Sequence, residues 1–414
     1  MNILFIHQNF PGQFKHLSVA LAKEGHHVVA LTLRVKEPTT WNGVRILPYT
    51  ILRKTPQKTH PWVTDFDSKV TRAESCYVAA KKLKETGYQP DIIIAHPGWG
   101  ESLFLRDVWP KARIGLYCEL FHLADYPHMN FDPEFGRKDP EVEALRIRLK
   151  NLNNQMHFEI AQAGISPTHF QADTFPEPFR SKISVIHDGI DTDMIRRNQW
   201  ASYQLPEGGA LTRKDEVITF VNRNLEPYRG YHIFMRALPR LLKARPNAQI
   251  LIVGGDGVSY GSAPRDGATW KQIFVDEVRG QISDADWARV HFLGRIPYKK
   301  FIELLQLSRA HVYLTYPFVL SWSLFEAMCA ETAIVASNTE PVREAVRHDE
   351  TGRLIDFFDG DALVAEVCGL LDSAEARARL GRAARAHIRD TYDLKTICLP
   401  KQMEWVHALA AMSV

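Results

Sequence analysis

The chain has little cysteine, and none of it is paired in sequence. Its 414 residues include five cysteines, which are scattered through mostly apolar segments without a Cys-x-x-Cys pair. That scatter argues against a structural zinc site and a disulfide framework, and it favours a reducing compartment. The formal net charge is only +3, and no block of lysine and arginine occurs. A nucleic-acid partner is therefore not expected.

Long apolar runs are also missing. No window approaches the roughly 18 consecutive apolar residues that a membrane-spanning helix needs. The amino-terminal MNILFIHQNF lacks the basic start and long apolar core of a signal peptide. We therefore expect a cytoplasmic protein. The lysines at 81, 82 and 84 fit either a solvated helix face or a patch that touches a membrane, so peripheral contact with the inner face of the membrane remains an open alternative.

Two successive runs of alternating strands and helices are present. The length predicts two or three domains, and a hydrophobic content of 45% is ordinary for a globular chain. Short β-branched and aromatic runs alternate with helical segments from Asn2, and the pattern begins again at Val217. The turn at Gly189 marks an edge between the two halves, and the polar stretch 198–216 is typical of a linker.

One unit in the second half carries a potential anion site. The pattern predicts a strand over 311–316 and a helix over 321–330. Ser321 and Ser323 are both suitable N-cap residues, and a diphosphate would be favoured at that helix end. Ser323 followed by Glu326 also fits a capping box, which needs no ligand. The sequence leaves both interpretations open.

Two arginines flank a loop near the start of the second half. Arg223 closes an apolar strand, and Arg229 follows a proline-containing loop. Two guanidinium groups around one loop would form an anion clamp, because each offers a planar fork of donors. The alternative is a pair of surface arginines. The glycine-rich turn 254–257 then ends the next strand, and Gly255 lies where the backbone could approach a ligand closely.

Polar groups follow the strand 91–95 in the first half. His96, Trp99 and Glu101 lie at this strand end among two glycines. Ligands bind at strand ends in open α/β sheets, so this group predicts a polar acceptor cleft in which a sugar ring could stack on Trp99. A well-capped turn explains the same residues without a ligand.

Another strand, 113–118, also ends in ionisable residues. Glu119 and His122 are candidate acid, base or hydroxyl-binding groups, and a structural histidine is the alternative for His122. The loop 124–140 that follows has the length of a lid or binding loop, and a polar helix is expected after it, over 141–161. Gly12 follows the first strand, where it suits either a close approach to a ligand or a tight turn.

In their order along the chain, these segments resemble the retaining glycosyltransferase family 4, which has the GT-B fold. VIHDGID at 185–191 and VNRNLEPYRG at 221–230 are similar to two motifs of that family, and LIVGGDG, VHFLGRIP and SLFEAMCAETAIVASNTEPVREAV follow in the expected order. The resemblance implies an α/β chain of two Rossmann-like domains whose parallel sheets face a central cleft. It places an acceptor-binding domain at 1–195 and a donor-binding domain at 196–393, with a helix at about 394–414 that packs back on the first domain.

The resemblance also implies roles for individual residues. Arg223 and Arg229 would bind the diphosphate of a nucleotide sugar and act in catalysis with Glu119 or His122, and the family uses no metal or other cofactor. His96, Trp99 and Glu101 would lie on the acceptor side. The remaining donor-binding positions are Gly12, Gly255, Arg295 and Ile296 beside the base, the amides of Ser321, Trp322 and Ser323, and Glu326 at the ribose.

Three positions depart from the family pattern. Phe318 stands where the family often has a carboxylate that touches the sugar, Arg229 replaces a lysine, and Ser321 replaces a glycine. In addition, the family's catalytic-region histidine has no clean match, because Glu119 and His122 both lie close to its place. The expected reaction is transfer of a hexose from a UDP- or GDP-sugar to a hydroxyl of a glycan or lipid-linked glycan, as in bacterial surface polysaccharide or glycolipid synthesis. The alternatives are a non-catalytic nucleotide-sugar-binding protein and a GT-B epimerase.

Overall fold

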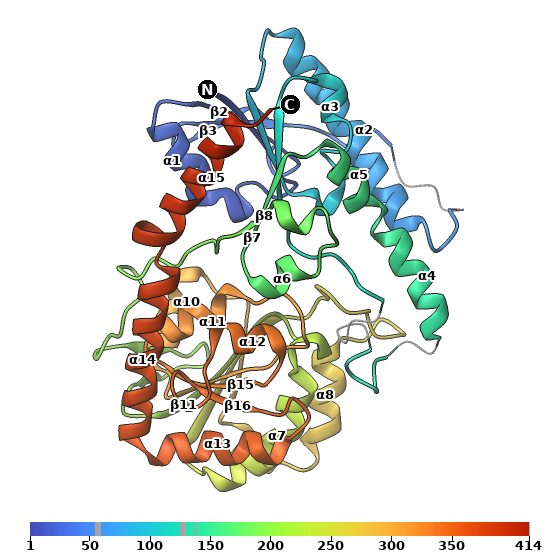
Figure 1. Ribbon diagram of the computed structural model, residues 1–414. Helices are drawn as coiled ribbons and strands as arrows, with labels where there is room; N and C mark the ends of the chain where they lie inside the picture. Colours follow the sequence, from blue (N-terminus) through green and yellow to red (C-terminus); the bar gives the residue numbers. More distant parts are fainter. Residues whose placement is uncertain (54–58, 125–129, 137–138, 414) are drawn as a thin grey trace. The chain divides into compact units, whose positions relative to one another are not determined.

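The computed structural model describes residues 1–53, 59–124, 130–136 and 139–413. The chain divides into two α/β units (Figure 1). The first contains Met1–Met129, Gly136–Gly189 and Lys395–Val414, and the second contains Asn130–Phe135 and Ile190–Leu394. The division between Gly189 and Ile190 follows the HDG turn, and the short segment 130–135 belongs with the second unit although its sequence neighbours belong to the first.

The first unit is built on an eight-stranded sheet in the order β3-β4-β2-β1-β5-β6-β7-β8. All paired strands are parallel except β3 and β4. The strand order reverses between β1 and β5, and such a reversal opens a crevice at the carboxyl ends of the strands. The strands are β1 (Asn2–Ile6), β2 (His27–Thr32), β3 (Thr39–Trp41), β4 (Val44–Pro48), β5 (Ile92–Ala95), β6 (Arg113–Tyr117), β7 (Ala163–Ser166) and β8 (Ile183–Val185).

Helices cover both faces of this sheet, because its central strands are apolar on both sides. Residues at alternate positions of β1 pack against α1 and α15 on one face and against α2 and α3 on the other. The carboxyl-terminal helix α15 therefore completes the core of the first unit, with Trp405 and Leu409 close to β6. The helices are α1 (Lys15–Lys23), α2 (Thr64–Glu85), α3 (Leu105–Val108), α4 (Pro140–Lys150), α5 (Leu152–Ile160), α6 (His169–Asp173) and α15 (Leu399–Ala411).

The second unit has a six-stranded parallel sheet in the order β13-β12-β11-β14-β15-β16. Its order reverses between β11 and β14, so the ends of these two strands define the crevice of this unit. The strands are β11 (Glu216–Asn224), β12 (Ala248–Gly255), β13 (Val290–Gly294), β14 (Ala310–Tyr313), β15 (Ala333–Ser337) and β16 (Arg353–Ile355).

Two helical layers enclose the second sheet (Figure 1). One core joins the strands to α7, α8 and α13, and the other joins them to α10, α11 and α14. Phe220 and Val221 of β11 belong to different cores, as the two-residue period of a strand requires. The helices are α7 (Tyr231–Ala244), α8 (Trp270–Arg279), α9 (Asp284–Trp287), α10 (Tyr298–Leu307), α11 (Trp322–Cys329), α12 (Glu340–Ala345), α13 (Gly360–Asp372) and α14 (Ala374–Tyr392).

Three local expectations differ from the structure. The strand expected over 311–316 ends at Tyr313, and the rest of that segment forms the loop before α11. The helix expected over 141–161 is broken at Asn151, which ends α4 and caps α5. The stretch 198–216 is not an unstructured linker, because β9 (Ser202–Gln204) and β10 (Ala210–Thr212) pair there as a hairpin. A core apolar residue, Tyr203, anchors that hairpin.

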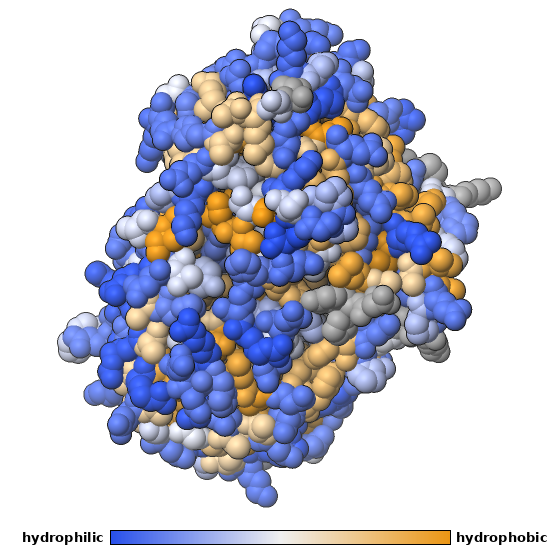
Figure 2. Space-filling view, in the orientation of Figure 1, coloured by the Kyte–Doolittle hydropathy of each residue, from blue (hydrophilic) through white to orange (hydrophobic). Residues whose placement is uncertain are grey.

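Polar and charged side chains cover most of the visible surface, with apolar patches between them (Figure 2). Within the described ranges, no helix combines the length and the apolar character that crossing a bilayer requires. Residues 125–129 and 137–138 of the loop expected over 124–140 lie outside the described residues, as do residues 54–58.

Candidate functional site

The crevice of the second unit is formed by the loops that follow β11 and β14. The first loop leads through a short 3-10 helix, Pro227–Arg229, into α7. The second runs from Leu314 to the start of α11. The loops meet at Gly230, whose φ of +68° suits glycine and where an added Cβ would lie 2.3 Å from Cβ of Leu314. Glycine at this position therefore lets the two loops touch.

Arg229 is a buried cation at this junction. Only 4% of its surface is exposed, and its Nη1 donates hydrogen bonds to Oγ1 of Thr315 at 2.8 Å and to the carbonyl of Val319 at 2.9 Å. Burial lowers the pKa of the guanidinium, but Tyr313, Tyr260 and Glu226 outweigh burial and raise it. Among the described residues, no carboxylate lies within ion-pair distance of Arg229, although the side chain stays charged.

Aromatic rings cover this guanidinium. Its central carbon lies 4.9 Å from the ring centre of Tyr260 and 5.8 Å from that of Phe318. The rings of Tyr260 and Phe318 are 4.9 Å apart, and Tyr228 packs edge-on against Phe318. We call Tyr228, Arg229, Tyr260 and Phe318 the Arg229 cluster. Phe318, at the position of a family carboxylate, thus contributes apolar contact to the arginine instead of charge.

The buried carboxylate of Glu226 holds the Tyr260 loop in place. It accepts hydrogen bonds from the backbone N–H groups of Ser259, Tyr260 and Gly261, at 3.1 to 3.3 Å. A carboxylate that satisfies several consecutive amides fixes a loop firmly. The loop after β12 is therefore tied to the loop after β11, with Tyr260 above Arg229.

Arg223 and Arg295 lie at the ends of neighbouring strands. Arg223 is exposed at the end of β11, and its guanidinium has no hydrogen bond or ion pair to any described residue. Arg295, after β13, donates from Nη2 to Oδ1 of Asn224 at 2.9 Å. Both side chains approach Gly255 closely: an added Cβ there would lie 2.6 Å from Nε of Arg295 and 2.7 Å from Oδ1 of Asn224. Ile296 packs on the adjacent core.

The helix α11 begins after Ser321, one of the two N-cap residues that the sequence offers. Ser321 is the N-cap, and its hydroxyl accepts from the N–H of Ser323. The N–H of Ser321 itself donates to the hydroxyl of Tyr313 at 2.9 Å. The capping box of Ser323 with Glu326 does not form, because the N-cap is Ser321. The carboxylate of Glu326 accepts from the hydroxyl of Tyr298 at 2.6 Å. A diphosphate would have to replace the bonds that the Ser321 and Ser323 amides now make. The side chain of Trp322 is exposed.

One short segment of the second unit lies in sequence between two ranges of the first unit. We call Asn130–Phe135 the anchor segment. Asp132 is buried, accepts from the hydroxyl of Tyr316 at 2.7 Å, and lies 2.9 Å from Nε2 of His232. Phe131 and Phe135 pack among aromatic rings on either side of it. The N–H of Tyr316 in turn donates to the carbonyl of Tyr228. Through Tyr316, the anchor segment is therefore linked to the Arg229 cluster.

The crevice of the first unit contains a buried group of rings, which we call the His96 cluster: His7, His96, Trp99 and Tyr117. The His96 ring centre lies 4.5 Å from that of Trp99 and 5.4 Å from those of His7 and Tyr117. Gly12, at φ +46°, comes so near His7 that an added Cβ would contact the imidazole at 2.4 Å. The cluster therefore joins the ends of β1, β5 and β6.

Hydrogen bonds fix the protonation of both imidazoles. Nδ1 of His7 accepts from the N–H of Asn9, so its Nε2 donates to Oε1 of Gln13 at 2.8 Å. Nδ1 of His96 accepts from the N–H of Gly98, which leaves the proton on Nε2, 3.7 Å from Oε2 of Glu119. Burial lowers the pKa of His7 to about 4 and that of His96 well below its usual value. Both rings are neutral donors at neutral pH.

The other predicted residues of this unit lie in different surroundings. His122 is half-buried, and its backbone is held by Asn151, which donates to the carbonyl of His122 and accepts from its N–H. Glu101 is fully buried and accepts from the hydroxyl of Tyr49 at 2.6 Å. Burial raises the pKa of the Glu101 carboxyl to about 7, against the opposing effect of Tyr49. The structure therefore brings Glu119 to the His96 cluster but places the Glu101 side chain inside the core.

Two family models match consecutive parts of the chain. The model of the glycosyl transferase family 4 group covers residues 24–195, and that of glycosyl transferases group 1 covers residues 205–387. The chain belongs to glycosyltransferase family 4. Its two Rossmann-like units are those of the GT-B fold, and solved structures show the same architecture. Sucrose-phosphate synthase of Thermosynechococcus elongatus superposes with a TM-score of 0.73 at 16% identity, covering 100% of both chains.

Several relatives of this glycosyltransferase have known activities. A phosphatidyl-myo-inositol mannosyltransferase of Mycolicibacterium smegmatis is 31% identical over 43% of this chain and 41% of its own length. A glycogen synthase of Mycobacterium tuberculosis is 25% identical over 92% and 87%. A D-inositol 3-phosphate glycosyltransferase of Segniliparus rotundus is 26% identical over 71% and 64%. The chain thus spans about two fifths of the first relative, and the substrates of the three differ.

Four residues of the two crevices were not predicted from the sequence. Glu226 and Asn224 follow Arg223 within the motif at 221–230, so their position at a strand end was the available signal. His7 gives the same signal at the end of β1, although a lone histidine closing an apolar strand is ambiguous. Asp132 gives no local signal, because its partners His232 and Tyr316 lie far away in sequence.

Replacing Asp132 tests the anchor segment. Burial pushes the pKa of this carboxyl up, but His232 and Tyr316 outweigh burial and hold it below its usual value. We expect Asp132→Asn to lower the free energy of unfolding by about 2–3 kcal/mol at pH 7, measured by urea unfolding. A group with a depressed pKa stabilises the fold above its unfolded pKa and loses that effect as pH falls. The difference between the two proteins should therefore shrink below about pH 4.

Glu134→Gln is the matched control, since Glu134 belongs to the same segment but forms an exposed ion pair with Arg236. Its cost should stay near or below about 1 kcal/mol. Equal costs for both variants would contradict the assigned importance of the buried carboxylate.

Replacing Glu101 tests the buried acid of the first unit. Its folded pKa of about 7 exceeds the unfolded value of 4.5, so the folded state favours the protonated form, and that stabilisation is lost as pH rises from about 4.5 to 7. We expect Glu101→Gln to unfold like the wild type near pH 4.5 and to be more stable by up to about 3 kcal/mol at pH 8. Urea unfolding at several pH values measures the difference. A constant difference across that range would show that the pKa of Glu101 is the same in the folded and unfolded states.

Proposed function

We propose that this glycosyltransferase moves a hexose from a UDP- or GDP-sugar to a hydroxyl acceptor, with retention of configuration and without a metal ion. The donor would bind in the crevice of the second unit and the acceptor in that of the first. Bacterial surface polysaccharide or glycolipid synthesis is the proposed setting. The activities of the mannosyltransferase and the glycogen synthase among the relatives support a glycosyl acceptor of this general kind.

The observation that carries the donor proposal is the buried charge of Arg229. A buried guanidinium is costly unless an opposite charge compensates it, and none of the described carboxylates lies within ion-pair distance of it. Thr315 and Val319 hold one nitrogen and thereby orient the fork. A diphosphate would supply the missing charge, with the exposed Arg223 as the second cation. The start of α11 would add a favourable dipole once the Ser321 and Ser323 amides turn to the ligand.

The Tyr260 loop has to move for that contact to form. Tyr260 and Phe318 cover Arg229 in the structure, and Tyr260 is more exposed than the arginine. Displacement of one ring would uncover the guanidinium while Glu226 keeps the rest of the loop attached. The nucleotide would then extend towards Gly255, Arg295 and Ile296, with Glu326 at the ribose.

The proposed step is a displacement on one face of the sugar. The acceptor oxygen bonds to the anomeric carbon on the face from which the diphosphate leaves, and the bond between that carbon and the phosphate oxygen breaks with its electrons. The hydroxyl proton passes to the departing diphosphate. Arg223 and Arg229 neutralise the charge that develops on the leaving group, a task that a metal ion would otherwise perform.

On the acceptor side, we assign the incoming sugar to the surroundings of the His96 cluster. Nε2–H of His96 and the carboxylate of Glu119 offer a donor and an acceptor 3.7 Å apart, and Trp99 supplies an aromatic surface. The neutral state of His7 and His96 suits hydrogen bonding to hydroxyl groups. His122 remains a candidate for the same role.

Ligand-induced stabilisation tests the donor class. A nucleotide that binds the folded state raises the melting temperature by mass action, so we expect a shift with UDP or GDP and their sugars and none with ADP. Release of free sugar or transfer to an added glycan would then identify an enzyme. Binding without any turnover would instead support a non-catalytic sensor, and a new nucleotide sugar formed without acceptor would support an epimerase.

Arg223→Ala tests the clamp directly. Removing a charge-assisted contact with a diphosphate should weaken nucleotide binding about 10- to 100-fold, measured by calorimetry. Arg382→Ala, which removes an exposed arginine of α14, should bind as the wild type does. Unchanged nucleotide affinity in Arg223→Ala would remove Arg223 from the donor site.

A further inference from the structure

A cavity of about 680 Å³ opens at the carboxyl ends of three neighbouring strands of the first unit. Gln8 and Asn9 follow β1, Leu33 and Arg34 follow β2, and the remaining walls come from the segment after β4 and from α2. Its volume suits a small polar ligand or a lipid headgroup. Strand ends in an open α/β sheet are also the usual place for a ligand.

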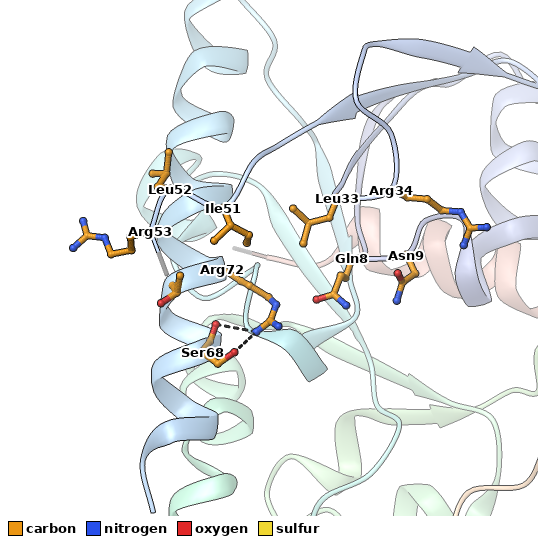
Figure 3. Close-up of a pocket in the computed structure, with 10 residues that line it drawn as sticks. Gln8, Asn9, Leu33, Arg34, Ile51, Leu52, Arg53, Ser68 and Arg72 are labelled. Atoms are coloured by element: carbon orange, nitrogen blue, oxygen red, sulfur yellow. Dashed lines mark hydrogen bonds between the residues drawn. The ribbon is translucent and has the colours of Figure 1, made fainter. Parts of the chain in front are cut away.

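Arg72 points into this cavity with one side of its guanidinium unused (Figure 3). Its Nη1 donates to the carbonyl of Ser68 at 2.9 Å and to the hydroxyl of Ser68 at 2.6 Å. These two bonds fix the plane of the group. The edge formed by Nε and Nη2 makes no hydrogen bond to any residue that the structure describes. That edge is the one with which arginine binds phosphate or carboxylate through two parallel bonds.

Three of the nearby acidic groups have partners other than Arg72, although Arg72 also lowers the pKa of the buried Glu101 carboxyl. Glu74 pairs with Arg53, Asp65 pairs with Lys69, and Glu101 accepts from Tyr49 inside the core. Asp67 forms no ion pair within the described part of the chain. Arg34 and Arg53 also line the cavity, but their side chains point away from its centre on opposite sides (Figure 3). The positive charge that faces the cavity is therefore that of Arg72.

The walls around Arg72 combine an unsatisfied amide with apolar surface. The Gln8 side chain lies beside Arg72 (Figure 3), and its Oε1 is buried without a hydrogen-bond partner among the described residues. Such an atom is costly unless a ligand satisfies it, and a hydroxyl group would do so. Leu33 and Ile51 face each other across the same space (Figure 3). Ile51 and Leu52 leave large apolar side chains exposed at the rim.

We propose that this cavity binds a phosphate ester of a polyol, with the phosphate on the Nε/Nη2 edge of Arg72 and a hydroxyl of the polyol on Gln8. An apolar substituent of the ester would lie along Leu33 and Ile51. The ligand is the acceptor, or the part of it next to the accepting hydroxyl, and only this identification rests on the proposed function. Two sources share the chemistry: a soluble sugar or inositol phosphate, and the headgroup of a phospholipid.

Direct binding, measured without any donor, tests the site. We expect calorimetry to detect myo-inositol 1-phosphate or glucose 6-phosphate, and the corresponding unphosphorylated polyols to bind at least about tenfold more weakly. Co-sedimentation with phosphatidylcholine vesicles, with and without phosphatidylinositol, distinguishes the second source. Binding to the soluble esters alone identifies a soluble ligand, and binding that needs phosphatidylinositol identifies a lipid. Absence of binding in both arms overturns the proposal.

Variants separate the two contacts. Arg72→Gln should weaken phosphate-ester binding at least about tenfold, whereas Arg53→Gln, at the outward-facing arginine of the same rim, should leave it unchanged. Gln8→Leu should weaken the polyol esters but not inorganic phosphate. Full ester affinity in Arg72→Gln, or equal losses in the two arginine variants, would contradict the assignment.

A second measurement keeps the two proposals separate. UDP and GDP affinity should be unchanged in Arg72→Gln, which also shows that the variant is folded. If the wild type binds the esters but no nucleotide, the cavity proposal stands and the proposed donor fails. If it binds nucleotide but no ester, the donor proposal stands and the cavity assignment fails.

Discussion

A guanidinium buried without a carboxylate partner sets the organisation of the second unit. Arg229 holds the loops after β11 and β14 together through Thr315 and Val319. Gly230 allows those loops to touch, and Glu226 attaches the loop after β12. Because no described carboxylate lies within ion-pair distance of Arg229, the nearby tyrosines and the more distant Glu226 stabilise its buried charge. The polar ends of three strands are thereby held as one site.

The anchor segment extends this arrangement to residues that precede the second unit by a long stretch of chain. Asp132 binds Tyr316, and the backbone of Tyr316 binds that of Tyr228 next to Arg229. A shift of the anchor segment would therefore change the positions of residues in the Arg229 cluster. This connection gives the segment 130–135 a structural task in the donor-binding unit, whereas the length of the loop around it predicted only a lid or a binding loop.

The crevice of the first unit is organised on a different principle. It holds neutral imidazoles, aromatic rings and a nearby carboxylate in place of a buried guanidinium. Such a site favours hydroxyl groups over strongly charged ones. The cavity at Arg72 lies beyond β1 on the side of β2 and β4 and adds a single oriented charge. Together the two regions suit a ligand that is mostly polyol and carries one anionic group.

The sequence alone determined most of the strands, the doubled α/β pattern, a serine N-cap at the start of α11 and the strand ends marked by Arg223 and His96. These features depend on residues that are near one another in sequence, and such residues produce the hydrophobic periodicity and the capping patterns that can be read without a structure. Only the tertiary structure decided that Glu101 is buried and that the hydroxyl of Tyr313 accepts a hydrogen bond from the N–H of Ser321. It also decided that Tyr260 covers Arg229 and that Asp132 contacts His232. Burial and hydrogen-bond partners of these groups come from elements far apart in the chain, so no local pattern could encode them.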